Sequence, residues 1–417
     1  MLRTPGEVIE SVYRSDWGRI VATLIKQLGD FDLAEECAQE AFAAAVDQWA
    51  EGIPETPAAW LLQTARHKAI DRIRRHRRYS EKLEEMLASG LLRTAEEPEY
   101  NTGEIPDERL RLIFTCCHPA LAPEAQVALT LHTLCGLETE EIARAFVLAT
   151  STMAQRLVRA KRKIRDARIP YVVPAVNQMP ERLNSVLTAI YLVFNEGYAA
   201  TRGNVLVRTD LCREAIRLGR LIQELMQPQP PREALGLLAL MLLHDARRET
   251  RYDAEGDPVL LEDQDRTRWN QPQIEEGLSL THAAMVAAPG PFALQAAIAA
   301  VHCRAVRSVD TGWNEILRLY DLLEDVQPSP IVSLNRAVAV AMTAGPDAAL
   351  KILDELAVHG DLENYHLLHA ARADLLRRSG QMQRAATSYR RALELAGNDR
   401  ERRWLERRLR EVTAGPF

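Results

Sequence analysis

The sequence lacks the long apolar segments that mark exported and membrane proteins. Its longest apolar run, from Ala234 to Leu243, is about half of the roughly 20 residues that a membrane-spanning helix needs. The segment from Met1 to Glu10 has no apolar stretch of the kind found in secretory signals. We therefore expect a cytoplasmic chain that has no membrane partner.

Cysteine is also scarce, with six residues scattered along 417. Cys116 and Cys117 are neighbours, but adjacent cysteines without a second pair do not match the spacing of a zinc site. The acids Glu262, Asp263 and Asp265 lack the surrounding loop of a calcium site. The sequence predicts reduced, buried thiols and no bound metal.

Catalytic signatures are missing as well, since there is no glycine-rich phosphate loop, nucleophile elbow or pair of catalytic carboxylates. These absences predict a protein without a cofactor and without enzymatic activity. Aromatic residues make up only 6% of the chain and hydrophobic residues 47%, with Ala, Leu, Arg and Glu abundant. This composition favours helices, so we expect an all-α fold of several domains.

The charge of the chain is acidic in sum, at −6, but it is unevenly distributed. Arg66 to Arg78 holds seven Lys/Arg against one acid, and Arg156 to Arg168 has the same balance. Each cluster ends a helical pattern of apolar residues. Local basic clusters of this kind are the electrostatic signature of nucleic-acid binding, whatever the net charge of the chain.

Residues 8–79 form the first predicted helical unit. Gly29-Asp30 interrupts its pattern, and Asp32 is the expected N-cap of a helix from Leu33 to Trp49. A third helix follows from Ala58 to about Tyr79. Residues 80–108 hold nine acids against two basic residues, which predicts an acidic linker.

Residues 109–168 form the second predicted unit. Pro123 opens a helix, Gly136 ends it, and Thr139 opens a short helix. A brief turn then leads into a basic helix from Ser151 to Arg168. Two helices joined by a short turn predict a helix-turn-helix motif.

A helix that enters the major groove needs short polar residues at its N-terminus and Arg or Lys further along. The second helix of this motif has that order. A solvated charged helix is the alternative interpretation. The residues predicted to bind DNA here are Ser151, Thr152, Met153, Gln155, Arg156, Arg159, Lys161 and Lys163.

The segment from Ala122 to Arg165 resembles the domain of extracytoplasmic-function sigma factors that binds the −35 promoter element. The resemblance lies in the Pro-Glu start, in "EEIA" from Glu140, and in "RLVRAK" from Arg156. Ala154 departs from the family, which often has Lys there, and this leaves the preferred DNA sequence open. The resemblance implies that residues 109–168 are sigma domain four, which contacts the polymerase flap.

The first unit resembles sigma domain two. Its "AEECAQEAF" segment is similar to the helix that docks on the clamp helices of core RNA polymerase, which implies a polymerase-binding set of Glu35, Glu36, Gln39 and Glu40. The segment from Pro57 to Arg75 is similar to the helix that contacts the −10 element. That similarity implies a DNA-binding set of Arg66, Lys68, Arg72, Arg74 and Arg75. The turn from Glu51 to Thr56 lies where the family captures a flipped base.

The remaining chain divides into a helical extension, 175–300, and a region of repeats, 313–411. Gly345 and Gly380 mark equivalent turns about 35 residues apart, a period typical of tetratricopeptide (TPR) units. The segments "FTCCHPAL" from Phe114, "YLVFNEGY" from Tyr191 and "LLEDQDRTRWN" from Leu260 resemble the extended branch of the family, which ends in TPR-like repeats. Polar residues such as Tyr198, His244 and Arg247 interrupt its apolar helices, and we expect charges such as Arg266 to satisfy them, with a ligand pocket as the alternative.

The sequence thus predicts a promoter-specificity factor that binds core RNA polymerase and promoter DNA and promotes melting. We expect the extension to contact the sigma domains or the polymerase and to set activity in cis. One alternative is a helix-turn-helix regulator with a ligand-sensing or enzymatic C-terminal domain. Another is a repeat scaffold whose basic clusters are incidental.

Overall fold

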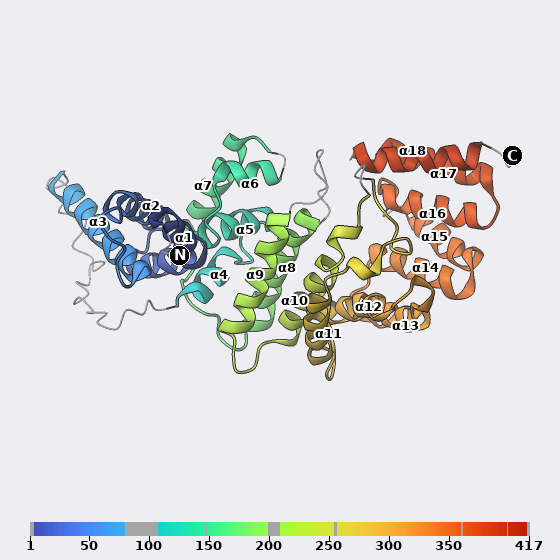
Figure 1. Ribbon diagram of the computed structural model, residues 1–417, viewed down its shortest axis with the longest axis horizontal. Coiled ribbons are helices and arrows are strands. Elements are labelled where there is room, and N and C mark those ends of the chain that lie inside the picture. The colour runs from blue at the N-terminus through green and yellow to red at the C-terminus, as the bar shows by residue number, and fades with distance from the viewer. Residues whose placement is uncertain are drawn as a thin grey trace. The chain divides into compact units, whose positions relative to one another are not determined.

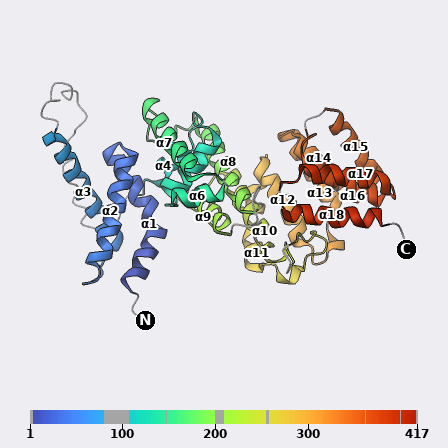
Figure 2. The ribbon, with the colours of Figure 1, turned by 90° about the horizontal axis from the view of Figure 1, so that it is seen from above.

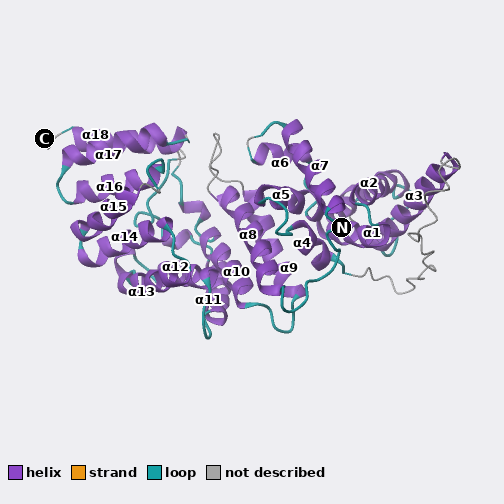
Figure 3. Cartoon of the chain, turned by 180° about the vertical axis from the view of Figure 1, so that it is seen from behind, coloured by secondary structure: helices purple, strands orange, loops and turns teal. Residues whose placement is uncertain are grey.

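The computed structural model describes residues 4–79, 107–146, 148–198, 209–253, 257–359, 362–397 and 399–414. Within these ranges every regular element is a helix, as Figure 3 shows, so the predicted all-α fold class is confirmed. None of the described helices is long and apolar enough to span a membrane. The chain divides into two compact units, residues 1–189 and residues 190–417.

The first three helices are α1 (Pro5–Leu28), α2 (Phe31–Gln48) and α3 (Pro57–Tyr79), and each packs against the other two. Gly29 ends α1 in the left-handed region, with φ of 68°, where glycine has no steric cost. Asp30 is the N-cap of α2, because its side chain accepts a hydrogen bond from the Leu33 amide at 2.9 Å. The predicted cap, Asp32, was wrong: helix α2 begins two residues earlier than expected.

The second part of this unit contains four α-helices and one π-helical turn. Their bounds are α4 (Arg109–Cys116), α5 (Pro123–Leu129), η1 (Thr130–Leu134), α6 (Thr139–Ala145) and α7 (Thr150–Asp166). The π-turn η1, which the sequence did not predict, continues α5. Helices α6 and α7 pack on each other, and α7 packs on α5, so the predicted helix-turn-helix arrangement is present (Figure 1).

Helix α8 (Met179–Tyr198) runs across the division between the units. The second unit continues with α9 (Thr209–Leu225), α10 (Arg232–Asp245), α11 (Gln271–Ala284) and α12 (Pro291–Arg304). It also contains the short 3₁₀ turns η2 (Arg248–Thr250), η3 (Arg266–Arg268) and η4 (Ser308–Asp310). Helix α10 is apolar on all sides and packs against α9, α11 and α12, so it forms the centre of this part of the fold.

The last six helices are α13 (Trp313–Val326), α14 (Pro330–Ala344), α15 (Pro346–His359), α16 (His366–Arg378), α17 (Met382–Leu395) and α18 (Asp399–Thr413). Each packs on its neighbour in the chain, as Figure 2 shows for α17 and α18. Gly345 and Gly380 lie between consecutive helices, and both have positive φ, of 90° and 75°, which glycine adopts without steric cost. Ala385, Tyr389 and Ala392 are buried in the shared core, as expected for a helical hairpin repeat.

Candidate nucleic-acid interface

Helix α7 has one apolar face and one polar face. Met153, Leu157, Ala160 and Ile164 recur at helical spacing and are buried. Thr152, Arg156, Arg159 and Lys163 also recur at helical spacing, on a different face, and all but the half-buried Arg156 are exposed. We call these four residues the α7 stripe. Ser151 and Gln155 are exposed beside it at the N-terminal end of the helix.

Two of the predicted DNA-binding residues do not lie on this exposed face. The Met153 side chain is 0% exposed, so it packs inside the domain and offers no surface to DNA. The Lys161 ammonium group turns to α2, where it lies 2.8 Å from Asp32 and 2.6 Å from Glu35. In this structure Lys161 is part of a contact between the two sigma-like domains.

The basic residues of α3 lie beside the acidic residues of α2. Arg72 pairs with Glu36, and it also lies 3.4 Å from Glu40, while Lys68 lies 3.9 Å from Glu40. Arg66 donates to the side chain of Gln27 at 2.9 Å. These ion pairs are largely exposed, so each stabilises the fold by at most about 1 kcal/mol and leaves its charges available to a partner.

The remaining predicted residues of this bundle are at the surface. Arg74 and Arg75 are exposed near the end of α3, and Gln39 is exposed on α2. The turn between α2 and α3 is also largely exposed, with Ile53 at 38%. The linker predicted over 80–108 lies outside the described residues except for its last two positions.

Glu35 differs from the other three predicted polymerase-binding residues, because it is buried at 5% exposure. One carboxylate oxygen accepts a hydrogen bond from the Thr133 hydroxyl at 2.7 Å. The other lies 2.6 Å from Lys161 Nζ and 3.4 Å from His132 Nε2. Its partners therefore come from η1 and α7, in the second domain of the unit.

The protonation states in this network follow from its geometry. Burial raises the pKa of Glu35, but the hydrogen bond from His132 and the charge of Lys161 outweigh it and lower the pKa to about 2. Burial lowers the pKa of His132, but the contact with Glu35 outweighs that and raises it. His132 Nδ1 faces the Leu137 carbonyl at 2.9 Å, so a proton on each ring nitrogen satisfies both acceptors.

Thr133, His132 and two aromatic side chains complete this contact, and none of them was predicted from the sequence. Trp17, which is 3% exposed, donates from Nε1 to the Thr133 carbonyl at 3.1 Å. The Tyr13 hydroxyl donates to the Gly136 carbonyl at 2.8 Å. These partners are about 100 or more positions apart in the chain, so no local pattern could have revealed them.

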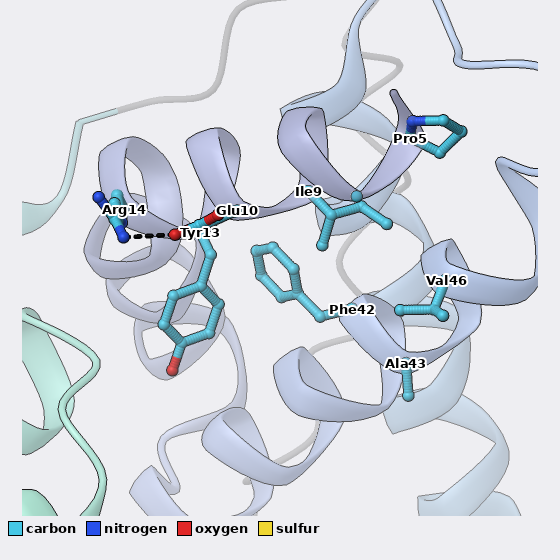
Figure 4. A pocket seen from close by; sticks show the side chains of 9 residues that line it. Pro5, Ile9, Glu10, Tyr13, Arg14, Phe42, Ala43 and Val46 are labelled. Atoms are coloured by element: carbon cyan, nitrogen blue, oxygen red, sulfur yellow. Dashed lines mark hydrogen bonds and ion pairs between the residues drawn. The ribbon is translucent and has the colours of Figure 1, made fainter. Parts of the chain in front are cut away.

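An apolar groove of about 650 Å³ lies between α1 and α2, and the sequence did not predict it either. Figure 4 shows Ile9, Tyr13, Phe42 and Val46 around it, with the Glu10–Arg14 ion pair at its edge. Val46 is 62% exposed. None of the residues predicted to bind DNA or polymerase lines this groove.

In the second unit the polar residues singled out in the sequence contact one another. Arg247 donates to the Tyr198 hydroxyl at 3.2 Å and lies 2.9 Å from His244 Nδ1. Arg266 instead donates to the main-chain carbonyls of His302 and Ala305, at 2.5 and 2.8 Å. Tyr198, His244 and Arg247 thus contact one another, whereas Arg266 contacts the end of α12, so the expectation that Arg266 would satisfy them was wrong.

Comparison with known proteins adds three matched families. Residues 12–79 match the family described as Sigma-70 region 2, and residues 111–164 match Sigma-70, region 4. Residues 182–285 match a family of unknown function, DUF6596. The two sigma matches cover the domain that carries α2 and α3 and the domain that carries α6 and α7.

Relatives support the same assignment. An uncharacterized protein of Rhizobium meliloti (strain 1021) is 43% identical over 400 residues, which cover 95% of this chain and 94% of the relative. A probable ECF RNA polymerase sigma factor, SigI, of Mycobacterium tuberculosis is 26% identical over 215 residues, 48% of this chain and 73% of the relative. The chain belongs to the extracytoplasmic-function branch of the sigma-70 family and is a promoter-recognition sigma factor with a C-terminal helical extension.

Proposed function

We propose that this sigma factor binds the −35 element through the α7 stripe, with Ser151 and Gln155 at its N-terminal end. The −10 element is contacted by the basic residues of α3, and core polymerase by Glu36, Gln39 and Glu40 on α2. The observation that carries this proposal is the division of α7 into a buried apolar face and an exposed basic face. Arg and Lys at the surface of such a helix bind phosphates, and short polar residues at its start reach base edges.

In vitro transcription with core polymerase tests the −35 contact. The variant R156A/R159A/K163A removes three positive charges from the stripe, and we expect at least a tenfold loss of transcripts from a promoter enriched with the wild-type protein. The salt dependence of promoter binding should also weaken, by about one unit of slope per lost phosphate contact.

Arg165 is the matched control for this experiment. It is exposed on α7 but lies off the stripe, so R165A removes a like charge from the same helix without removing a proposed contact. We expect R165A to transcribe like the wild type. Equal activity of the triple variant and R165A would refute the proposed −35 surface.

The extension is proposed to be a regulatory part of the protein without catalytic activity of its own. It has cores that are separate from the sigma domains, among them the one formed by α14 to α18. Among the described residues, no three His, Cys, Asp or Glu side chains lie close enough together to hold a metal ion. A stack of helical hairpins offers a broad surface, and protein binding is a common use of such surfaces.

Transcription by the full chain and by residues 1–189 tests the role of the extension. If the extension sets activity in cis, the two proteins will differ in transcript yield at equal polymerase occupancy. An unchanged yield would remove the regulatory role and leave the promoter-binding proposal intact.

A further inference from the structure

The two sigma domains of the first unit are held together by a close, hydrogen-bonded contact. Trp17 and Tyr13 of α1 donate to the carbonyls of Thr133 and Gly136, at 3.1 and 2.8 Å. Gly18 lies so close to η1 that an added Cβ would overlap the Leu134 carbonyl oxygen. A contact this close needs glycine on the α1 side.

Glu35 lies in the same contact, where it contacts His132 and Thr133 of η1 and pairs with Lys161 of α7. Asp32 of α2 also pairs with Lys161. A buried ion pair stabilises a fold poorly, because the loss of hydration offsets much of the attraction. A buried pair does specify which surfaces meet, since separating its partners leaves a charge without a counter-ion in a dry contact. Glu35 and Lys161 thus select one particular docking of domain four on domain two.

This docking is incompatible with simultaneous binding of both promoter elements. The −10 and −35 elements are about 25 base pairs apart, or about 85 Å in straight B-form DNA at about 3.4 Å per base pair. Lys161 on the −35 helix is nevertheless bonded to α2, and α2 packs directly on the −10 helix α3. The contact must therefore open before the protein can occupy a promoter.

The chain between the domains is long enough for this opening. About 30 residues separate Tyr79 at the end of α3 from Arg109 at the start of α4. A segment of that length can span at most about 100 Å when fully extended. Opening therefore requires loss of the contact and no unfolding of either domain.

We propose that the contact of Glu35 with Thr133, His132 and Lys161, together with the Gly18–Leu134 approach, is an autoinhibitory latch that keeps the free sigma factor closed. Core polymerase is the partner that opens it, because its clamp and flap bind the two domains separately. The inference rests on the proposed function for the identity of the two DNA-binding helices. The latch also withholds Glu35 and Lys161 from any outside partner until it opens.

A glycine substitution provides a test that leaves Glu35 and Lys161 in place. Gly18→Ala adds a methyl group that separates α1 from η1, and alanine suits a helix better than glycine does. Gly6→Ala is the matched control, because Gly6 lies in the same helix and an added Cβ there meets nothing within 4 Å. Thr133→Val is a second opening variant, which removes the hydrogen bond to Glu35 while keeping the side-chain shape.

Energy transfer in the full-length protein reports whether the latch is closed. Dyes on non-natural amino acids at the exposed positions Gln63 of α3 and Val158 of α7 avoid the native cysteines. We expect efficient transfer in the wild type and in G6A, a fall on adding core polymerase, and low transfer in G18A and T133V before polymerase is added. Because only open molecules bind, the opened variants should bind core polymerase about tenfold more tightly.

The latch is overturned if G18A and T133V, folded by circular dichroism, keep the transfer efficiency and polymerase affinity of G6A. It is also overturned if wild-type protein binds polymerase and promoter with no fall in transfer. A different result would refute the proposed function alone. In that result the variants open as expected, but none of the proteins supports transcription from an enriched promoter.

Discussion

Buried charge is used differently in the two units of this protein. In the first unit, Glu35 is neutralised by His132 and Lys161, which belong to another domain. In the second unit, Arg266 is partly buried over the Trp269 ring and donates to the carbonyls that end α12, within one continuous fold. A charge paired across domains can be separated without unfolding either domain, whereas a charge that ends a helix cannot leave without damaging the fold.

The largest effect is expected from Arg266→Met in the second unit. It leaves two helix-terminal carbonyls without a donor and removes the stacking on Trp269, at 4.7 Å. We expect a loss of about 3 kcal/mol in the free energy of unfolding of this unit, measured by urea denaturation. Arg307→Met is the control, because Arg307 pairs with Asp310 at the surface and its replacement should leave the stability almost unchanged. Equal effects of the two substitutions would show that Arg266 is not a structural cap.

The second-largest effect is expected from Lys161→Met in the first unit. Removing one partner of a buried pair leaves Glu35 with only His132 to balance its charge, so we expect the closed form to weaken by about 2 kcal/mol. The double variant E35M/K161M should regain most of this, since two apolar side chains can replace a buried pair at little cost. The readout is the urea concentration at which energy transfer between positions 63 and 158 is lost. If the double variant opens as readily as K161M, the pair does not act as a unit.

Acidification should change the stability of the two units in opposite directions. Burial, together with Arg247 and Arg266, lowers the pKa of His302 to about 4, and burial lowers that of His244 well below its usual value. Since the folded values lie below those of the unfolded chain, the second unit has its full stability above about pH 6.5 and loses it as the pH falls. His302 alone should cost about 2 kcal/mol between pH 7 and pH 5.

The first unit responds over a different pH range. The pKa of Glu35 is lowered to about 2, so its contribution is complete above about pH 4.5 and is lost only below that. The pKa of His132 is raised, so its contribution is complete below about pH 6.5 and falls as the pH rises through its folded value. Hydrogen exchange at pH 7 and pH 5 should therefore show the second unit loosening while the latch tightens. Loosening of both units at pH 5 would contradict this assignment.

Much of the first unit could be predicted from the sequence because its signals are local. Helix α3 begins one residue before its predicted start, and α7 was placed to within two residues at each end. The burial of Met153 could also be predicted from its helical spacing with Leu157, Ala160 and Ile164. The π-turn η1 has no comparable signal, because it ends the helix and too few helical residues follow it to show the shift of face that an extra residue causes.

The sequence by itself determined the helical fold, the two sigma domains, and the basic and acidic helix faces that identify the family. These depend on the order of residues along single helices, where spacing alone sets which side chains share a face. The burial of Glu35 was decided only by the tertiary structure. Its neighbours Glu36, Gln39 and Glu40 stay at the surface, whereas its own partners lie 97 to 126 positions further along the chain. Local spacing cannot show which distant surface covers a helix. Because a distant surface covers Glu35, this residue belongs to the proposed latch and is not exposed for a contact with polymerase.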